Sequence, residues 1–240
     1  MQDPLATTKK SSVNNKLNNL ILKHSSDFKS ICDGINEYIK VSNSNIQKLT
    51  DENQSILINC VNGLTKVAEY SIEYGNYKDT WDYGSYYEHI YGPELIVKSL
   101  KTNCDYRIGM EENGIYLSFE LSYNSNLRYM DDGFWKKLLE LTEFDGFKYS
   151  EYEFTSDKQR KQFPELFKTN KSMIYRIMRK YFFSVINSDY NYRSSSIGEF
   201  QITWSKEKDL ENIIKDCCLA FRKMYQLNYK LWKISKSKRK

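Results

Sequence analysis

The feature that most constrains the fold is an Asn-Gly pair between two alternating segments. Residues 105–124 read DYRIGMEENGIYLSFELSYN, with apolar and polar residues alternating on either side of Asn113-Gly114. Asn-Gly adopts the positive φ values of a two-residue hairpin turn at little cost. A period of two places side chains such as Ile115 and Phe119 on one face of a strand. The segment therefore predicts an antiparallel hairpin with one buried face.

Helical spacing of apolar residues dominates the N-terminal third, over residues 15–39 with a break near Ser25-Ser26, and over 51–73. Further helices are predicted at 132–141, 163–186 and 205–225, and strands at 147–154 and 199–204. No regular strand–helix–strand rhythm occurs, and the hairpin is antiparallel. We therefore predict an α+β fold, in which a helical N-terminal third precedes an antiparallel hairpin within a small sheet, flanking helices and a C-terminal helix.

We expect four segments along the chain. They are a disordered N-terminus (1–14), a helical subdomain (15–73), an α+β domain (74–230) and a basic tail (231–240). No stretch approaches the roughly 20 apolar residues that cross a bilayer, and the N-terminus lacks the apolar core of a secretory signal. The five cysteines form no C-x-x-C pair. Together these features favour a cytoplasmic protein with reduced thiols and no membrane partner.

Charge is distributed unevenly along the chain. The 36 basic and 31 acidic residues give a net charge of +5, and residues 229–240 alone hold six of the bases. Residues 130–155 carry seven acids and three lysines, whereas residues 157–182 carry eight bases and two acids. A basic block beside aromatic residues is typical of a nucleic-acid surface, although a solvated helix face and a basic tail give the same pattern.

Residues 74–92 read YGNYKDTWDYGSYYEHIYG, which is dense in tyrosine and has no clean period. We predict a long irregular loop here, and such loops often carry function. Its rings could form a stacking surface, contributed by Trp81, Tyr83, Tyr86 and Tyr87. The alternative is that these rings cover the rim of a core while their polar atoms meet water.

Signatures of catalysis are absent. There is no G-x-G-x-x-G, G-x-x-x-x-G-K-[ST] or G-x-S-x-G motif, and the two histidines, His24 and His89, are too few for a His-rich metal site. Glu94, Glu120 and Lys98 could be assembled into a magnesium-dependent nuclease site, but the usual acid-x-lysine spacing is missing. We therefore assign no catalytic residue, metal ligand or cofactor, and expect a binding protein rather than an enzyme.

Several segments, taken in order, resemble one family. Gly75-Asn76-Tyr77 followed by Trp81, the hairpin over 105–124 and the closing helix LENIIKDCCLAFRKMYQ are similar to the N-terminal DNA-binding domains of McrB-type modified-cytosine restriction proteins. The chain lacks the family's proline before the tryptophan, and its spacing there differs by one residue. The resemblance implies binding of duplex DNA and extrusion of a base into an aromatic pocket, where stacking on Trp81 would repay the cost of unstacking.

Our leading hypothesis is a DNA-binding protein or domain, within a restriction or phage-defence system that could include an ATPase or nuclease partner. The residues expected to neutralise phosphates are Lys158, Arg160, Lys161, Lys171, Arg176, Arg179 and Lys180. A second hypothesis is an inhibitor or adaptor from a mobile element that binds protein through its Tyr/Trp-rich segment. A metal-dependent nuclease is the third.

Overall fold

The computed structural model describes residues 15–42, 51–88, 92–111, 114–152, 160–162, 176–179 and 197–237. Its long helices are α2 (Ser25–Ser42), α3 (Asp51–Gly75), α4 (Asp132–Leu139) and α6 (Leu210–Ser237), and residues 15–23 and 176–179 are also helical. Two 3-10 turns, η1 (Asn124–Tyr129) and η2 (Glu140–Glu143), flank α4. The strands are β1 (Trp81–Glu88), β2 (Gly92–Ser99), β3 (Cys104–Glu111), β4 (Gly114–Glu120), β5 (Phe147–Tyr152), β6 (Arg160–Gln162) and β7 (Glu199–Ser205). The α+β prediction is confirmed.

The strands form one antiparallel sheet in the order β1-β2-β3-β4-β7-β5-β6. The predicted hairpin is present as β3 and β4, with Met110 opposite Ile115 and Tyr106 opposite Phe119. Gly114 begins β4 at φ 151°, and a Cβ there would overlap the carbonyl oxygen of Trp204. Glycine is therefore required at this position by both backbone conformation and space.

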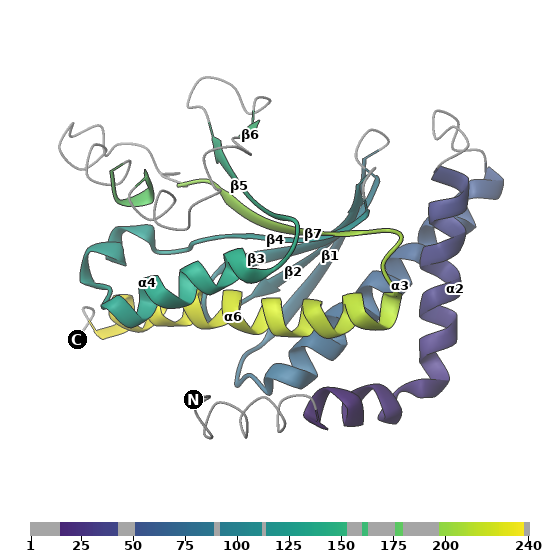
Figure 1. The fold of residues 1–240 in the computed structure, drawn as a ribbon, viewed down its shortest axis with the longest axis horizontal. Coiled ribbons are helices and arrows are strands. Elements are labelled where there is room, and N and C mark those ends of the chain that lie inside the picture. Colours follow the sequence, from purple (N-terminus) through teal and green to yellow (C-terminus); the bar gives the residue numbers. More distant parts are fainter. Residues whose placement is uncertain are drawn as a thin grey trace, which may run out of the picture.

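One face of the sheet carries the core. Leu95, Tyr106, Leu117 and Phe200 point from neighbouring strands to this face and are buried. Helices α3, α4 and α6 lie on the same side of the sheet, and α2 packs outside α3 (Figure 1). Hydrophobic residues of the first helices and of α6 belong to one buried cluster. The helices predicted over 15–73 thus share one core with the sheet, because α3 buries its apolar face against the sheet and α6.

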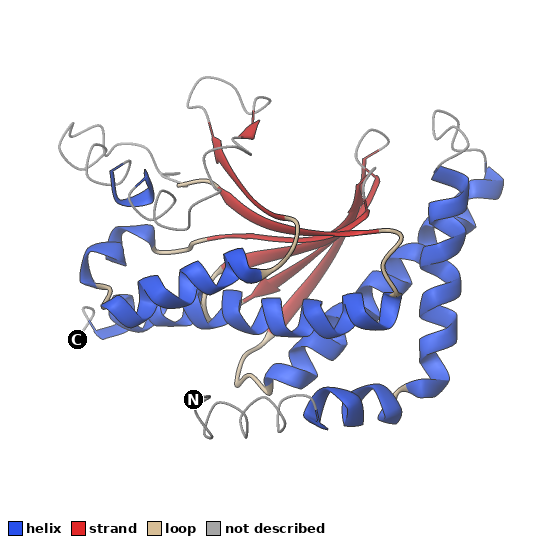
Figure 2. Cartoon of the chain, in the orientation of Figure 1, coloured by secondary structure: helices blue, strands red, loops and turns tan. Residues whose placement is uncertain are grey.

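The opposite face of the sheet is polar and has no long helix against it in the described chain (Figure 2). Its rows include Glu94, Arg107, Tyr116 and Gln201, which alternate with the core residues along their strands. Alternation of buried and polar positions is what an antiparallel sheet with one covered face requires. We call this the open face.

The prediction of a long irregular loop over residues 74–92 needs correction. Residues 81–88 of the predicted aromatic loop form strand β1, which pairs with β2 at the edge of the sheet. The core-side positions of this edge strand are only partly covered, with Trp81 half-buried and Tyr83 exposed, so its hydrophobic alternation is weak and the sequence signal is poor. The predicted basic tail is helical as far as Ser237, because Leu231 continues the buried stripe of α6. The predictions for residues 1–14, 163–175 and 180–186 lie outside the described residues.

Candidate nucleic-acid interface

The predicted stacking surface is only partly exposed. The half-buried indole of Trp81 lies against Tyr77, Tyr106, Phe221 and Tyr225, with ring centroids 5.6 to 6.1 Å apart. Its Nε1 is buried and has no hydrogen-bond partner. Trp81 therefore belongs to the rim of the core beneath α6, as the alternative interpretation held for the ring, but its polar atom is buried and does not meet water.

The other predicted rings follow Trp81 along β1. Tyr83 is 43% exposed, and burial raises the pKa of its hydroxyl, with a smaller contribution from Glu69 of α3. For Tyr86 and Tyr87 the structure describes the strand backbone alone. Within the predicted surface, Tyr83 is thus the one described ring that faces solvent.

The predicted phosphate-binding residues lie elsewhere. Arg160 and Lys161 are in β6, Arg176 and Arg179 are in the helical turn 176–179, and Lys158, Lys171 and Lys180 lie outside the described residues. Strands β1 and β6 are at opposite edges of the seven-stranded sheet. At about 4.8 Å between neighbouring strands, the two edges are separated by roughly 29 Å. The rings of β1 and the cations of β6 are therefore far apart across the sheet.

A different combination of rings and cations occurs on α6. Tyr229 is 39% exposed and lies 5.3 Å from Trp232, centroid to centroid. The Nζ atoms of Lys101 and Lys236 lie 5.9 and 5.2 Å from the centroid of the Trp232 ring, within the range of a cation–π contact. We call these four residues, together with the exposed Lys233, the Trp232 surface.

The helical repeat explains how α6 builds this surface. Positions 225, 229, 232 and 236 are three or four residues apart, so they follow one side of the helix. Tyr225 at the inner end of this row is buried and stacks on Tyr229 at 6.0 Å. Helix α3 ends at Gly75, and Arg222 lies near its last turn, 3.5 Å from the hydroxyl of Tyr74. The second half of α6 therefore continues beyond α3, which leaves this side uncovered by any described helix.

Lys101 reaches the surface from the turn between β2 and β3, and Asp79 fixes that turn. The Asp79 carboxylate accepts hydrogen bonds from the Lys101 amide at 3.1 Å, the Ser99 hydroxyl at 2.6 Å and the Tyr225 hydroxyl at 2.9 Å. Burial, followed by this bond to Asp79, raises the pKa of Tyr225 well above its ordinary value. The turn and α6 are thus held together by one carboxylate.

The cations on the two sides of α6 differ in their partners. On the side facing α4, Lys223 pairs with Glu140 at 2.6 Å and Lys230 with Asp131 at 3.4 Å. On the Trp232 surface, Lys101, Lys233 and Lys236 form no ion pair with any described residue. The Trp232 surface therefore holds cations whose charge is not neutralised within the described chain.

The open face of the sheet, in contrast, carries more carboxylates than cations. Its described side chains include six carboxylates and three cations, namely Asp82, Glu94, Asp105, Glu111, Glu120, Glu199, Lys98, Arg107 and Lys148. A pocket of about 180 Å³ at one end of this face is lined by three of the acids and by Arg107. Phosphates are repelled by such an excess of carboxylates, so this face does not suit nucleic acid.

The nuclease residues considered from the sequence do not meet. Glu94 accepts a hydrogen bond from Tyr116 and pairs with Arg107 at 3.6 Å, whereas Glu120 lies in the row of Asp105 and Lys98. Four residues of β2 separate Glu94 from Lys98, which is about 13 Å along a strand. Among the described residues no group of three or more His, Cys, Asp or Glu side chains could hold a metal ion.

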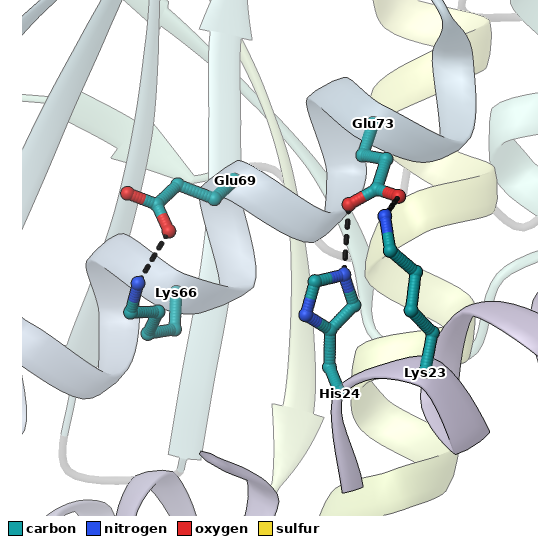
Figure 3. Close-up of polar contacts among 5 residues, drawn as sticks. All are labelled: Lys23, His24, Lys66, Glu69 and Glu73. Atoms are coloured by element: carbon teal, nitrogen blue, oxygen red, sulfur yellow. Dashed lines mark hydrogen bonds and ion pairs between the residues drawn. The ribbon is translucent and has the colours of Figure 1, made fainter. Parts of the chain in front are cut away.

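His24, the histidine that the structure describes, takes part in contacts between helices. His24 lies at the turn before α2, and its Nε2 is 2.8 Å from Glu73 of α3, which also accepts a 2.5 Å hydrogen bond from Lys23 (Figure 3). The same view shows Lys66 paired with Glu69 one turn earlier on α3. The contacts of Lys23 and His24 with Glu73 tie the N-terminal helices to α3, and no nucleophile is among these residues. His89 lies outside the described residues.

No protein-family model, curated protein or solved structure matches this chain. The resemblance to McrB-type domains therefore remains a prediction. Among the described helices none is both long and apolar enough to cross a membrane. The sequence did contain a signal for the Trp232 surface, since the segment YKLWKISKSKRK interleaves aromatic and basic residues. Its pairing with Lys101 depends on the fold and has no local signal.

Proposed function

We propose that this protein binds DNA without catalysing a reaction, and that the Trp232 surface makes the contact. The observation that carries the proposal is the presence of three cations without described ion-pair partners beside the exposed ring of Tyr229 and the half-buried ring of Trp232. Cations of this kind neutralise phosphates and release counterions, while the rings offer apolar area that is otherwise in water. The acidic open face leaves the helical side as the favourable approach for a polyanion.

The base-extrusion mechanism implied by the McrB resemblance is not part of this proposal. It requires an aromatic pocket that admits a base, and Trp81 packs instead against four rings of the core rim. A role in a restriction or defence system, with an ATPase or nuclease partner, rests on that resemblance alone.

Salt dependence of binding tests the proposal. With three phosphate contacts, affinity should fall about 20-fold for a single strand and about 40-fold for a duplex between about 50 and 200 mM salt. The measurement is fluorescence anisotropy of a labelled oligonucleotide, offered both single-stranded and as a duplex. Affinity that is unchanged over this range, or no binding to either form, would refute the proposal and favour a protein-binding adaptor.

A pair of double variants tests the location. Lys233→Glu with Lys236→Glu should weaken DNA binding by about tenfold or more, because two phosphate contacts become repulsive. Lys29→Glu with Lys40→Glu makes the same change in net charge on exposed positions of α2, away from α6. Equal losses in the two variants would show that net charge, and not the Trp232 surface, governs binding.

A further inference from the structure

The two rings of the Trp232 surface, Tyr229 exposed and Trp232 half-buried, indicate which form of DNA this surface binds. In a duplex the flat faces of the bases are stacked on one another and paired, so an exposed tyrosine or tryptophan reaches sugar and phosphate only. In a single strand each base has a free face, and stacking on an aromatic side chain is favourable for any base. Tyr229 and Trp232 therefore contribute fully to binding only when the bases are unpaired.

The placement of α6 argues against a binding mode in which this helix enters the major groove of duplex DNA. A helix that enters the major groove must project from its domain, with several side chains free on the leading side. Eleven of the 28 residues of α6 are buried, and the helix lies flat against the sheet between α3 and α4 (Figure 1). On the side of the Trp232 surface it presents the row of Tyr229, Trp232 and Lys236, and this row suits a strand laid along the helix.

The dimensions of this row fit a short stretch of chain. From Arg222 to Lys236 the helix rises about 21 Å. Lys233 and Lys236 lie within this length beside the two rings, and Lys101 approaches Trp232 from the β2–β3 turn. Cations on both sides of the rings can contact the phosphates before and after a stacked base, which is the pattern of single-strand grooves.

We propose that the Trp232 surface binds single-stranded DNA in preference to duplex DNA, with bases stacked on Tyr229 and Trp232 and phosphates held by Lys101, Lys233 and Lys236. This inference rests on the proposed function, because it names the form of nucleic acid that the same surface takes. It adds that the rings, and not the cations alone, determine affinity.

The test compares two forms of one DNA sequence with the full-length protein and ring variants. Single-stranded DNA should bind at least tenfold more tightly than the duplex at equal salt. Tyr229→Ala should weaken single-strand binding about 5-fold to 150-fold, the range for loss of one stacked base, and leave duplex binding nearly unchanged. Tyr83→Ala, which removes a ring of similar exposure on β1, is the matched control and should have no effect.

Tryptophan fluorescence supplies a second readout that does not depend on loss of affinity. Addition of oligo(dT) should quench emission from Trp232, and Trp232→Phe should abolish that part of the quenching while it retains most of the binding. Equal affinity for single strand and duplex, with no change in Tyr229→Ala, would overturn the single-strand inference and leave DNA binding intact. Absence of binding to both forms would overturn the proposed function itself, so the two failures are distinguishable.

Discussion

Asp79 should be among the most stabilising polar residues of the fold. One carboxylate oxygen accepts from the amides of Thr80 and Lys101, and the other accepts from the hydroxyls of Ser99 and Tyr225. Three of these four donors are more than 15 residues away in the chain, so the denatured state cannot keep them. The carboxylate thereby joins the segment before β1, the β2–β3 turn and α6.

The expected cost of Asp79→Ala follows from those three long-range bonds. A hydrogen bond to a charged group contributes about 1.5–3 kcal/mol, and partial exposure of Asp79 lets water replace some of it. Taking about 1 kcal/mol for each long-range bond, we expect a loss of about 3 kcal/mol, part of which reflects the fully buried Ser99 left without its acceptor. Tyr225→Phe removes one of the three donors and should cost about 1 kcal/mol.

Urea unfolding followed by circular dichroism measures these values, provided that the variants keep the slope of the parent protein. A double-mutant cycle between Asp79→Ala and Tyr225→Phe should give a coupling energy of about 1 kcal/mol, since the two side chains share one bond. Asp105→Ala is the control, because Asp105 is an exposed acid of the sheet whose side chain makes no hydrogen bond or ion pair with a described residue. If Asp79→Ala and Asp105→Ala cost the same, the carboxylate does not organise this region.

Three further predictions concern other parts of the fold. Glu73→Gln should cost about 0.5 kcal/mol at neutral pH. Lys23, followed by His24, lowers the pKa of Glu73 below 4.5. The stabilisation is therefore present above that pH and is lost on acidification. Parent and variant that differ equally in urea unfolding at pH 7 and at acid pH would contradict this prediction. Gly146→Ala should lower stability by more than about 2 kcal/mol, because φ is 77° and a Cβ would overlap a backbone oxygen, whereas a thermal midpoint equal to that of the parent would show that the turn relaxes. In the native state a thiol reagent should label Cys32 first, since Cys32 is only half-buried and the other four cysteines are buried. Mass spectrometry that found uniform labelling would contradict the burial of these four.

Elements with a strong local signal could be predicted from the sequence. The Asn-Gly hairpin, strand β7 and helix α4 all formed where expected, and Asp131 caps α4 by accepting the Phe134 amide at 2.8 Å. In each case the deciding interaction lies within a few residues, as for a turn conformation, an alternation or a first-turn amide. Such interactions are visible in a single segment of sequence.

Elements that depend on distant partners could not be predicted in the same way. Strand β7 lies between β4 and β5, although about fifty residues separate it from β5 in the chain, and no periodicity specifies that order. Strand β1 pairs on one side only, so its mixed residues read as a loop. The same reason applies to the candidate site, because Lys101 meets Trp232 only after the β2–β3 turn packs beside α6.

Charge separation within the fold explains why a modest net charge is compatible with binding a polyanion. At physiological salt the Debye length is about 8 Å, and a sheet with a helix packed on it is thicker than this. Carboxylates of the open face are therefore largely screened from a strand on the Trp232 surface, and the α6 cations that pair with no described acid act almost independently of them. The total of +5 thus carries little information about affinity. What determines binding is whether neighbouring acids neutralise a given lysine, as Glu140 does for Lys223 and as no described acid does for Lys236.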